Sequence, residues 1–518
     1  FGTGQRKFNP MYEASLGNFE KNKIDEIINN LQIRWDMGKG FMAQASVGLQ
    51  KSWDSNKRYI DPKSMKGSKQ LSSDNLLAGD LYTMEGNSSK WNTRLGLSYN
   101  ANLGRNNLNF SVIGEINQSQ SYRVSTHYVG FAAGTSADIN YASKVEGKPT
   151  KSEGLSRYAG LNGIFNYSFD NIYLADLSIR YEGSSIFGKE QQSTPYWSGG
   201  LGLNIHNYNF LKESEFISRL KVRASYGQVG NVNFEPHMSH NYFESMFDDW
   251  YITGFGSGLY YMGNSDLKSE KTNTFDVSVD LSFLQDKINF TATYYNKKTH
   301  DMINDVTVPS SSGFMSYKDN IGKIRNRGVE FSLYANVLNR EDWFLSVHGN
   351  FAKNKEVLLK IADSMKRYNE RVNEKYADYE GINSGKKEYA EVYTKYEEGG
   401  STTAFYGMKS LGIDPANGKE VFVDRAGNIT YEYDAGQQTI IGNTEPKGQG
   451  SFGFNLRWKN LTLSSVFQYE FGADRYNETL VNYVENADIE GSNVDRRVLT
   501  QRWQKPGDIA PLKDIKDS

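Results

Sequence analysis

The sequence predicts an all-β protein, namely a transmembrane antiparallel up-and-down β-barrel that crosses a membrane with its strands. Two observations predict this fold: segments in which apolar and polar residues alternate, and a regular exchange of short and long connections between those segments. In residues 274–283, the apolar members of the alternation are Phe275, Val277, Val279, Leu281 and Phe283. A period of two places apolar and polar side chains on opposite faces of a strand. We therefore expect one face to meet an apolar medium and the other to meet water.

Fourteen alternating segments pair into seven hairpins along the chain. At this composition a single alternating window of ten residues arises by chance about once per thousand windows, so the regular recurrence is what indicates the fold. The paired segments are 31–35 with 41–53, 91–101 with 108–118, 157–168 with 173–183, 195–206 with 218–229, 274–283 with 288–294, 328–337 with 343–351, and 448–458 with 461–471.

Short and long connections alternate strictly between these segments. The long ones cover about residues 54–90, 119–156, 184–194, 230–270, 297–327 and 352–447. In an up-and-down meander, alternate connections lie at opposite ends of the sheet. Short turns at the periplasmic end and long loops at the extracellular end are typical of outer-membrane barrels. A sandwich or a propeller has no reason to keep this order.

Composition excludes several other classes of protein. The chain has no Cys, which excludes disulfides and thiolate metal sites. Its net charge is −2, with 59 basic and 61 acidic residues, so no overall field attracts nucleic acid. The mean hydropathy is −0.65 and no apolar run reaches 18 residues. We expect no transmembrane helix, whereas transmembrane strands need only alternating segments of about ten residues.

Aromatic residues also favour a membrane barrel. They make up 14% of the chain, led by 34 Tyr and 28 Phe, and aromatic girdles flank the apolar band of such barrels. Trp35, Trp91, Trp343 and Trp458 are expected at strand ends next to short turns. An amphipathic ring at the level of the lipid headgroups explains that placement.

No motif of an enzyme, a metal site or a cofactor site stands out. His237 and His240 lie three residues apart, but no acidic helix accompanies them to complete a zinc site. Residues 414–419 resemble a calcium loop only loosely and fit a turn before a strand better. We therefore predict no catalytic residues, no metal and no cofactor.

One long connection carries candidate substrate or partner contacts. Exposed aromatic rings beside carboxylates suit sugar or peptide surfaces, because flat rings stack and carboxylates accept hydrogen bonds. The alternative is that this loop packs against other loops. The candidate residues are Phe247, Asp248, Asp249, Trp250, Tyr251, Tyr260 and Tyr261.

Several longer motifs resemble one family, the SusC/RagA-type TonB-dependent outer-membrane transporters. Each motif is weak alone, but they occur in the order found in the family. They are YEGSSIFG at 181–188, LKVRASYGQVGN at 220–231, GNSDLKSEKT at 263–272, NIGKIRNRGVE at 320–330, FYG at 405–407, GIDP at 412–415, IGNTEP at 441–446 and RWQKPGD at 502–508. Gly328 of the fourth motif is expected where a loop re-enters a strand and needs a permissive backbone.

The resemblance implies part of a barrel of about 22 strands with a plugged lumen. It implies a Gram-negative, Bacteroidetes-like outer membrane as the location, contact with outer-membrane lipid, a SusD-like surface lipoprotein as a lid, and the TonB–ExbB–ExbD complex as energy source. Residues 1–518 would be a partial barrel domain whose longest loop covers about 352–447. We expect the N-terminal plug domain to lie outside this chain.

The leading functional hypothesis is TonB-dependent import of oligosaccharides or peptides together with the lipoprotein. A second hypothesis is a SusC-like barrel that serves as a structural or partner-binding subunit of a larger outer-membrane assembly. A third is a soluble β-rich adhesin or carbohydrate-binding protein.

Overall fold

The computed structural model describes most of the chain. The described residues are 10–68, 77–187, 193–231, 238–252, 254–307, 314, 316–320, 322–361, 365–367, 369–370, 393–434, 437–485, 491 and 494–514.

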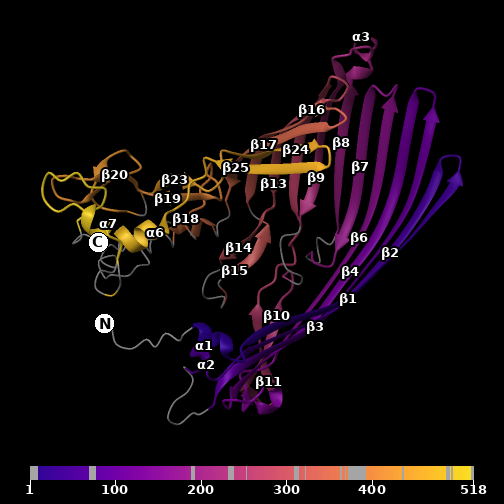
Figure 1. Cartoon of the computed structure of the whole chain (residues 1–518). Coiled ribbons are helices and arrows are strands. Elements are labelled where there is room, and N and C mark those ends of the chain that lie inside the picture. Colours follow the sequence, from indigo (N-terminus) through magenta and orange to yellow (C-terminus); the bar gives the residue numbers. More distant parts are fainter. Residues whose placement is uncertain are drawn as a thin grey trace.

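Fourteen strands of the described chain follow one another, each beside the next, in a single antiparallel sheet (Figure 1). They are β1 (Phe19–Gly38), β2 (Phe41–Ile60), β3 (Ala78–Leu103), β4 (Asn106–Phe131), β6 (Thr150–Phe169), β7 (Tyr173–Ser184), β8 (Ser193–Asn204), β9 (Ile217–Asn231), β12 (Glu270–Phe283), β13 (Ile288–His300), β16 (Lys323–Asn339), β17 (Trp343–Lys360), β24 (Gly448–Trp458) and β25 (Leu461–Phe471). The short β5 (Lys144–Val145) pairs with β4 beside this path. The seven predicted hairpins are therefore confirmed in number and order.

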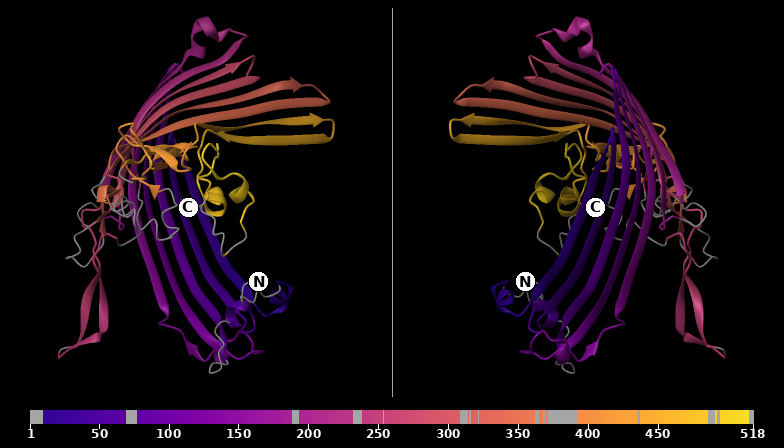
Figure 2. Two further views of the ribbon diagram at one scale, coloured as in Figure 1. Left: turned by 90° about the vertical axis from the view of Figure 1, so that its left-hand side faces the viewer. Right: turned by 90° about the vertical axis from the view of Figure 1, so that its right-hand side faces the viewer.

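The sheet curves so that one of its faces is concave, and the short turns lie together at one end of it (Figures 1 and 2). The turn after β12 uses Leu284, Gln285 and Asp286 in the left-handed region, with φ of 55°, 60° and 64°. The connection after β8 holds a 3₁₀ turn, η3 (Ile205–Asn207), and α3 (Asn209–Lys212). Strands β1 and β25 form the two edges of the path.

One face of the sheet is apolar across all the strands. In one row, Val222, Val279, Ala292, Phe331 and Phe351 are successive Cα partners on five neighbouring strands. Large apolar side chains of this face stay exposed within the chain, as with Leu201 at 71% and Leu333 at 44%. Because the opposite face is polar and concave, the apolar face is the outer one, and lipid is the medium that covers it.

The first strands are far longer than the sequence predicts. Strands β3 and β4 have 26 residues each, so the predicted loops 54–90 and 119–156 consist largely of strand. At about 3.3 Å per residue and a tilt of about 40°, such a strand rises about 65 Å, against an apolar band of about 25 Å. Alternation disappears above the band because both faces of the strand meet water there, which explains the missed segments.

The glycine of the NIGKIRNRGVE motif has a role other than the predicted one. Gly328 lies inside β16 rather than at its entry, and its φ is not positive. A Cβ there would sit 2.5 Å from the hydroxyl of Tyr295 and would strike the backbone oxygen of Lys353. The glycine is therefore needed for space beside Tyr295, not for backbone freedom.

The tryptophans mark both edges of the apolar band. Trp343 and Trp458 are Cα partners beside short turns, and their rings stack at 5.6 Å. Trp35 also lies near a short turn, as predicted. The prediction is wrong for Trp91, which lies in the middle of β3, where the apolar face ends and the polar extension begins.

Smaller elements build the extracellular connections. Two hairpins stand between the long strands: β10 (Tyr242–Tyr251) with β11 (Gly254–Tyr261), and β14 (Ile303–Thr307) with β15 (Ser316–Asn320). The connection after β17 carries the sheets β18 (Tyr393–Thr394), β19 (Ala404–Gly407), β23 (Thr439–Asn443) and β20 (Lys409–Ile413), β21 (Glu420–Val423), β22 (Ile429–Thr430). The remaining helical turns are α1 (Pro10–Ser15), α2 (Met65–Ser68), η1 (Ile139–Tyr141), α6 (Glu478–Leu480), η7 (Val481–Glu485) and α7 (Arg497–Thr500). Within the described ranges, no helix has the length and apolar composition that a membrane span requires.

Candidate functional site

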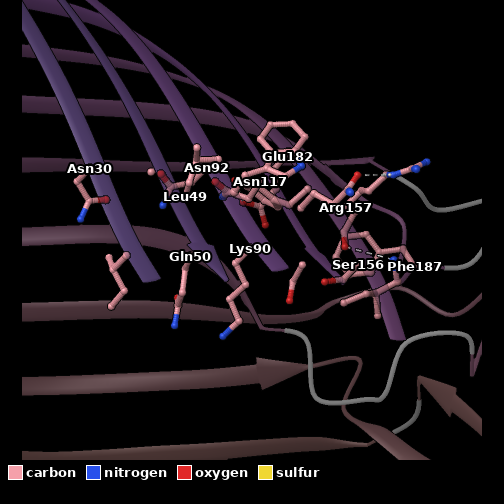
Figure 3. A pocket seen from close by; sticks show the side chains of 18 residues that line it. Asn30, Leu49, Gln50, Lys90, Asn92, Asn117, Ser156, Arg157, Glu182 and Phe187 are labelled. Carbon is pink, nitrogen blue, oxygen red and sulfur yellow. Dashed lines mark hydrogen bonds between the residues drawn. The ribbon is translucent and has the colours of Figure 1, made fainter. Parts of the chain in front are cut away.

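A row of polar side chains crosses the inner face of the first five strands. Asn30, Gly48, Asn92, Asn117 and Tyr158 are successive Cα partners on β1, β2, β3, β4 and β6. Together with a parallel row above it, this row lines a hollow of about 620 Å³ (Figure 3). That volume lies within the range of small-molecule sites. The alternation along each strand places these side chains on the concave face.

The floor of the hollow depends on one glycine. A Cβ on Gly48 would lie 2.8 Å from Oδ1 of Asn30 and would strike Oδ1 of Asn92. The two amides therefore lean over Gly48 from the strands on either side. An amide offers two N–H donors and a carbonyl acceptor, so this floor can bind a neutral ligand that both donates and accepts hydrogen bonds.

The second row supplies more hydrogen-bonding groups. Gln50, Lys90, Ser119 and Ser156 are successive Cα partners above the amide row. The side-chain amide of Gln50 donates to Glu26 at 2.7 Å. Figure 3 shows Asn30, Gln50 and Lys90 pointing to the same side of the sheet. Amides, serine hydroxyls and the ammonium of Lys90 make up these two rows. Apolar side chains and two further charged residues complete the lining, among them Trp91, Phe187, Arg157 and Glu182.

An ion cluster at the edge of the hollow holds four strands together. Arg180 of β7 contacts Glu115 at 2.7 Å and Glu182 at 2.6 Å. Arg94 contacts the other oxygen of Glu115 at 3.2 Å. The hydroxyl of Tyr158 lies 3.1 Å from Glu115 and 2.9 Å from Glu182. Two arginines and two glutamates cancel in charge, so the cluster braces the wall and gives the lumen no net charge at this level.

The structure offers no metal centre in the part of the chain that it describes, because no three His, Asp or Glu side chains gather there closely enough. His237 lies outside the described residues. Residues 414–419 form the predicted turn: Oδ1 of Asp414 accepts from the backbone N–H of Ala416 at 2.8 Å, and Tyr431 donates to Oδ2 at 2.5 Å. The carboxylate of Asp414 therefore accepts hydrogen bonds from the turn itself and from Tyr431, which follows β22.

Comparison with known proteins decides the family. A model of the family described as TonB dependent receptor-like, beta-barrel, matches residues 7–466. This chain belongs to that family. Its members are outer-membrane receptors and transporters rather than enzymes, and this excludes the soluble adhesin.

Among the curated relatives of this TonB-dependent barrel is TonB-dependent receptor P3 of Formosa agariphila, 27% identical over 81% of the chain and 44% of that protein. Another is TonB-dependent receptor SusC of Bacteroides thetaiotaomicron, 26% identical over 90% of the chain and 46% of that protein. The chain therefore spans less than half the length of these relatives. Among solved structures, the RagAB peptide transporter superposes with a TM-score of 0.81 at 21% identity, covering 97% of this chain and 53% of that one. The resemblance to SusC and RagA is thereby confirmed.

The structure places the predicted aromatic contacts on a hairpin rather than an irregular loop. Figure 2 shows this hairpin, β10 with β11, standing clear of the main sheet. Tyr260 is 70% exposed, and Tyr261 packs against Tyr242 with ring centroids 6.0 Å apart. Phe247, Asp248, Asp249, Trp250 and Tyr251 lie on β10, and their side chains are outside the described part of the structure.

Two motifs of the TonB-dependent barrel meet in space although they lie far apart in sequence. The indole N–H of Trp503 donates to the backbone oxygen of Pro415 at 2.9 Å. The backbone N–H of Asp514 donates to the backbone oxygen of Gly418 at 3.0 Å. Gly418 has φ of +73°, and a Cβ there would lie 2.5 Å from the Trp503 ring. Sequence reasoning missed this contact because no local pattern links the GIDP and RWQKPGD motifs.

Two glutamates attach the extracellular connection between β17 and β24 to the barrel wall. Oε1 of Glu445, in the IGNTEP motif, accepts from the side-chain amide of Asn354 at 2.6 Å, and Oε2 accepts from the backbone N–H of Glu356 at 3.3 Å. The carboxylate of Glu356 in turn accepts from the backbone N–H of Thr402 at 2.8 Å and from Ser401 at 3.1 Å. The end of β17 thus holds the connection that follows it at two places, in its middle at Ser401 and Thr402 and near its C-terminal end at Glu445.

A buried lysine lies within the same extracellular region. Lys395 is only 2% exposed. Burial lowers the pKa of its amine to about 8, and Arg425 adds to this shift, whereas Glu397 and Asp434 oppose it. On the neighbouring strand, burial raises the pKa of Tyr406 to about 12. Folding therefore holds an amine where its charged form is disfavoured.

Proposed function

We propose that this chain is part of an outer-membrane importer that takes up oligosaccharides or peptides. The proposal includes a SusD-like surface lipoprotein as partner and the TonB–ExbB–ExbD complex as the source of energy. The observation that carries it is the neutral amide row of Asn30, Asn92 and Asn117 on the inner wall. Two likenesses support it: the SusC relative and the fold shared with a peptide transporter. Because the chain spans less than half of its relatives, import is proposed for the whole protein.

The chemistry of the hollow fits both classes of cargo. Sugar hydroxyls and peptide bonds each combine hydrogen-bond donors with acceptors, which amide side chains match. The uncharged amides of Asn30, Asn92 and Asn117 also avoid the desolvation cost that fixed charges at these three positions would impose on an uncharged ligand. A cargo that passes along this row meets uncharged hydrogen-bonding groups on β1, β3 and β4.

Substitution of the amide row in the full-length transporter tests this proposal. Asn92→Leu with Asn117→Leu removes two amides from the inner face, whereas Thr93→Leu changes the outer face one residue away. Each lost hydrogen bond contributes about 0.5–1.5 kcal/mol, so cargo affinity should fall about 5- to 160-fold in the double variant. Uptake is measured with oligosaccharides and peptides of defined size at limiting concentration. Normal uptake by the double variant at normal surface abundance would reject the inner-wall site.

We also propose the hairpin β10–β11 and the connection covering about 352–447 as partner or cargo contacts. The exposed ring of Tyr260 supports this for the hairpin. A photocrosslinker at position 260 should capture the surface lipoprotein, whereas one at Tyr173, beside the short turn at the opposite end, should not. Equal capture from both positions would remove the hairpin from the proposal.

The alternative role is that of a subunit in a larger envelope assembly. It differs from import in that it does not require energy from TonB. Deletion of the TonB-contact segment in the full gene should abolish growth on the cargo while leaving the barrel in the membrane. Unchanged growth on every tested nutrient, together with a defect in envelope assembly, would instead support the structural role.

A further inference from the structure

A second hollow lies on the outer face of the same strands. Its volume is about 1020 Å³. Large apolar side chains stand around it, with exposed fractions of 60% for Leu95, 52% for Ile116 and 55% for Leu161. Gly114 and Ala159 lie among these residues, and their small side chains leave space at the centre of the hollow.

The register of the strands places this hollow on the lipid side. Leu95, Gly114, Leu161 and Tyr181 are successive Cα partners on β3, β4, β6 and β7. They belong to the apolar set of the alternation, opposite Asn92 and Asn117 of the inner hollow. Tyr181 stays 55% exposed, and its hydroxyl lies 2.7 Å from that of Ser193, another lining residue. The hollow is therefore a recess in the apolar band.

The upper rim of the recess is polar and carries a cation. Trp91, Gln118 and Arg157 are successive Cα partners and all line the recess. Nε of Arg157 donates to the side-chain oxygen of Gln118 at 3.0 Å, which fixes the guanidinium beside the rim. Figure 3 shows Arg157 extending away from Gln50 and Lys90 of the inner face.

An acidic residue on the same face of β6 already has a cationic partner. Glu153, four residues along β6 from Arg157, forms an ion pair with Lys151 at 2.8 Å. Within the described residues, the guanidinium of Arg157 contacts the amide oxygen of Gln118 and forms no ion pair, so its charge can still pair with an anion that covers the recess.

The height of Arg157 matches the headgroups of the outer leaflet. From Arg157 to the short turn at Phe169, the strand covers about 12 residues, or about 40 Å. At a tilt of about 40° this is a rise of about 30 Å, against an apolar band of about 25 Å. The cation therefore sits just above the band, and the apolar recess extends below it toward the membrane centre.

We propose that this recess binds one molecule of lipid A from the outer leaflet. An acyl chain lies over Gly114 and Ala159, and a phosphate of the glucosamine headgroup pairs with Arg157. A guanidinium group forms two parallel hydrogen bonds with phosphate. The recess also gives the acyl chain of the lipid more apolar contact than the convex outer wall does elsewhere. The height of Arg157 along the barrel selects a lipid of the extracellular leaflet, and its positive charge selects a lipid that carries a phosphate.

The test uses the full-length transporter, extracted in mild detergent and supplied with purified lipid A. Native mass spectrometry counts the bound lipid. Arg157→Gln removes the cation, and Gly114→Leu fills the recess, where a Cβ meets nothing within 4 Å. The control is Arg327→Gln, which removes an exposed arginine from the outer face of β16.

We expect the wild type and Arg327→Gln to retain one lipid A, and Arg157→Gln and Gly114→Leu to bind it at least about tenfold more weakly. Loss of lipid A in Gly114→Leu together with normal folding, judged by heat-modifiable gel mobility, would show that the recess itself is occupied. Equal retention by all four proteins, or retention of phospholipid in preference to lipid A, would overturn the proposal. Because neither result concerns cargo uptake, the proposal stands or falls independently of the import function.

Discussion

Placing one arginine on each face of β16 provides a direct test of which face meets lipid. Leu333 belongs to the apolar set and pairs with Phe290 and Gly349, whereas its neighbour Ser332 points to the concave side. Both side chains are exposed within the chain. Leu333 lies about six residues from the short turn, which corresponds to about 15 Å of rise at a tilt of about 40°. This is close to the middle of the apolar band.

Leu333→Arg should therefore destabilise the barrel by about 2–4 kcal/mol, the cost of a cationic side chain near the bilayer midplane. This corresponds to a decrease of about 30- to 900-fold in the folding equilibrium constant. Ser332→Arg, which faces the wet lumen, should change stability by no more than about 0.5 kcal/mol.

The assay is urea unfolding of full-length protein refolded into vesicles, with tryptophan fluorescence as the readout and the same lipid for both variants. Similar slopes with urea would show that the two variants differ in stability and not in compactness. If the two variants are equally stable, or if Ser332→Arg is the weaker protein, the assignment of the faces is wrong.

Three further predictions concern the extracellular region and the strand contacts. Lys395→Met should stabilise the region after β17 at pH 7 by about 1–3 kcal/mol, because the wild-type amine must be charged below its pKa of about 8 yet stays buried. In the wild type, protection from limited proteolysis should rise as the pH increases from about 8 toward 10.5, the ordinary pKa of lysine. In that interval Lys395 binds a proton in the unfolded chain but not in the folded one. The same rise in Lys395→Met would contradict this account. Glu445→Ala should speed proteolysis of the same region about tenfold by releasing its attachment to β17, whereas Glu432→Ala, an exposed glutamate outside the attachment, should leave the rate unchanged. Gly230→Ala should cost about 1–3 kcal/mol because its Cβ would strike the ring of Tyr196, and a double-mutant cycle with Tyr196→Leu should recover most of that loss.

The membrane-crossing part of this protein could be predicted because lipid imposes a local rule. Every strand in the apolar band must place apolar residues on alternate positions, as in the segment from Phe275 to Phe283, and this rule is visible without knowing the partner strands. The order of the strands followed from the parity of short and long connections. The parts of β3 and β4 above the band escaped prediction, because water on both faces removes the alternation.

The candidate site could not be read in the same way. Asn30 and Asn92 are far apart in sequence, and only the register of β1, β2 and β3 brings both amides over Gly48. The contact of Trp503 with Pro415 depends likewise on the course of two long connections. Such polar contacts leave no periodic pattern in the sequence. They depend on which residues face one another across neighbouring strands or connections, and not on whether a face meets lipid or water.

The sequence by itself thus determined that the chain is a strand meander with one lipid-facing surface, and its motifs indicated the family. The tertiary structure decided what the two surfaces hold: a neutral amide row inside, and an apolar recess capped by Arg157 outside. The physical reason is that the solvent on each face selects residue types along a strand, whereas the shape of a site depends on which strands become neighbours and in which register.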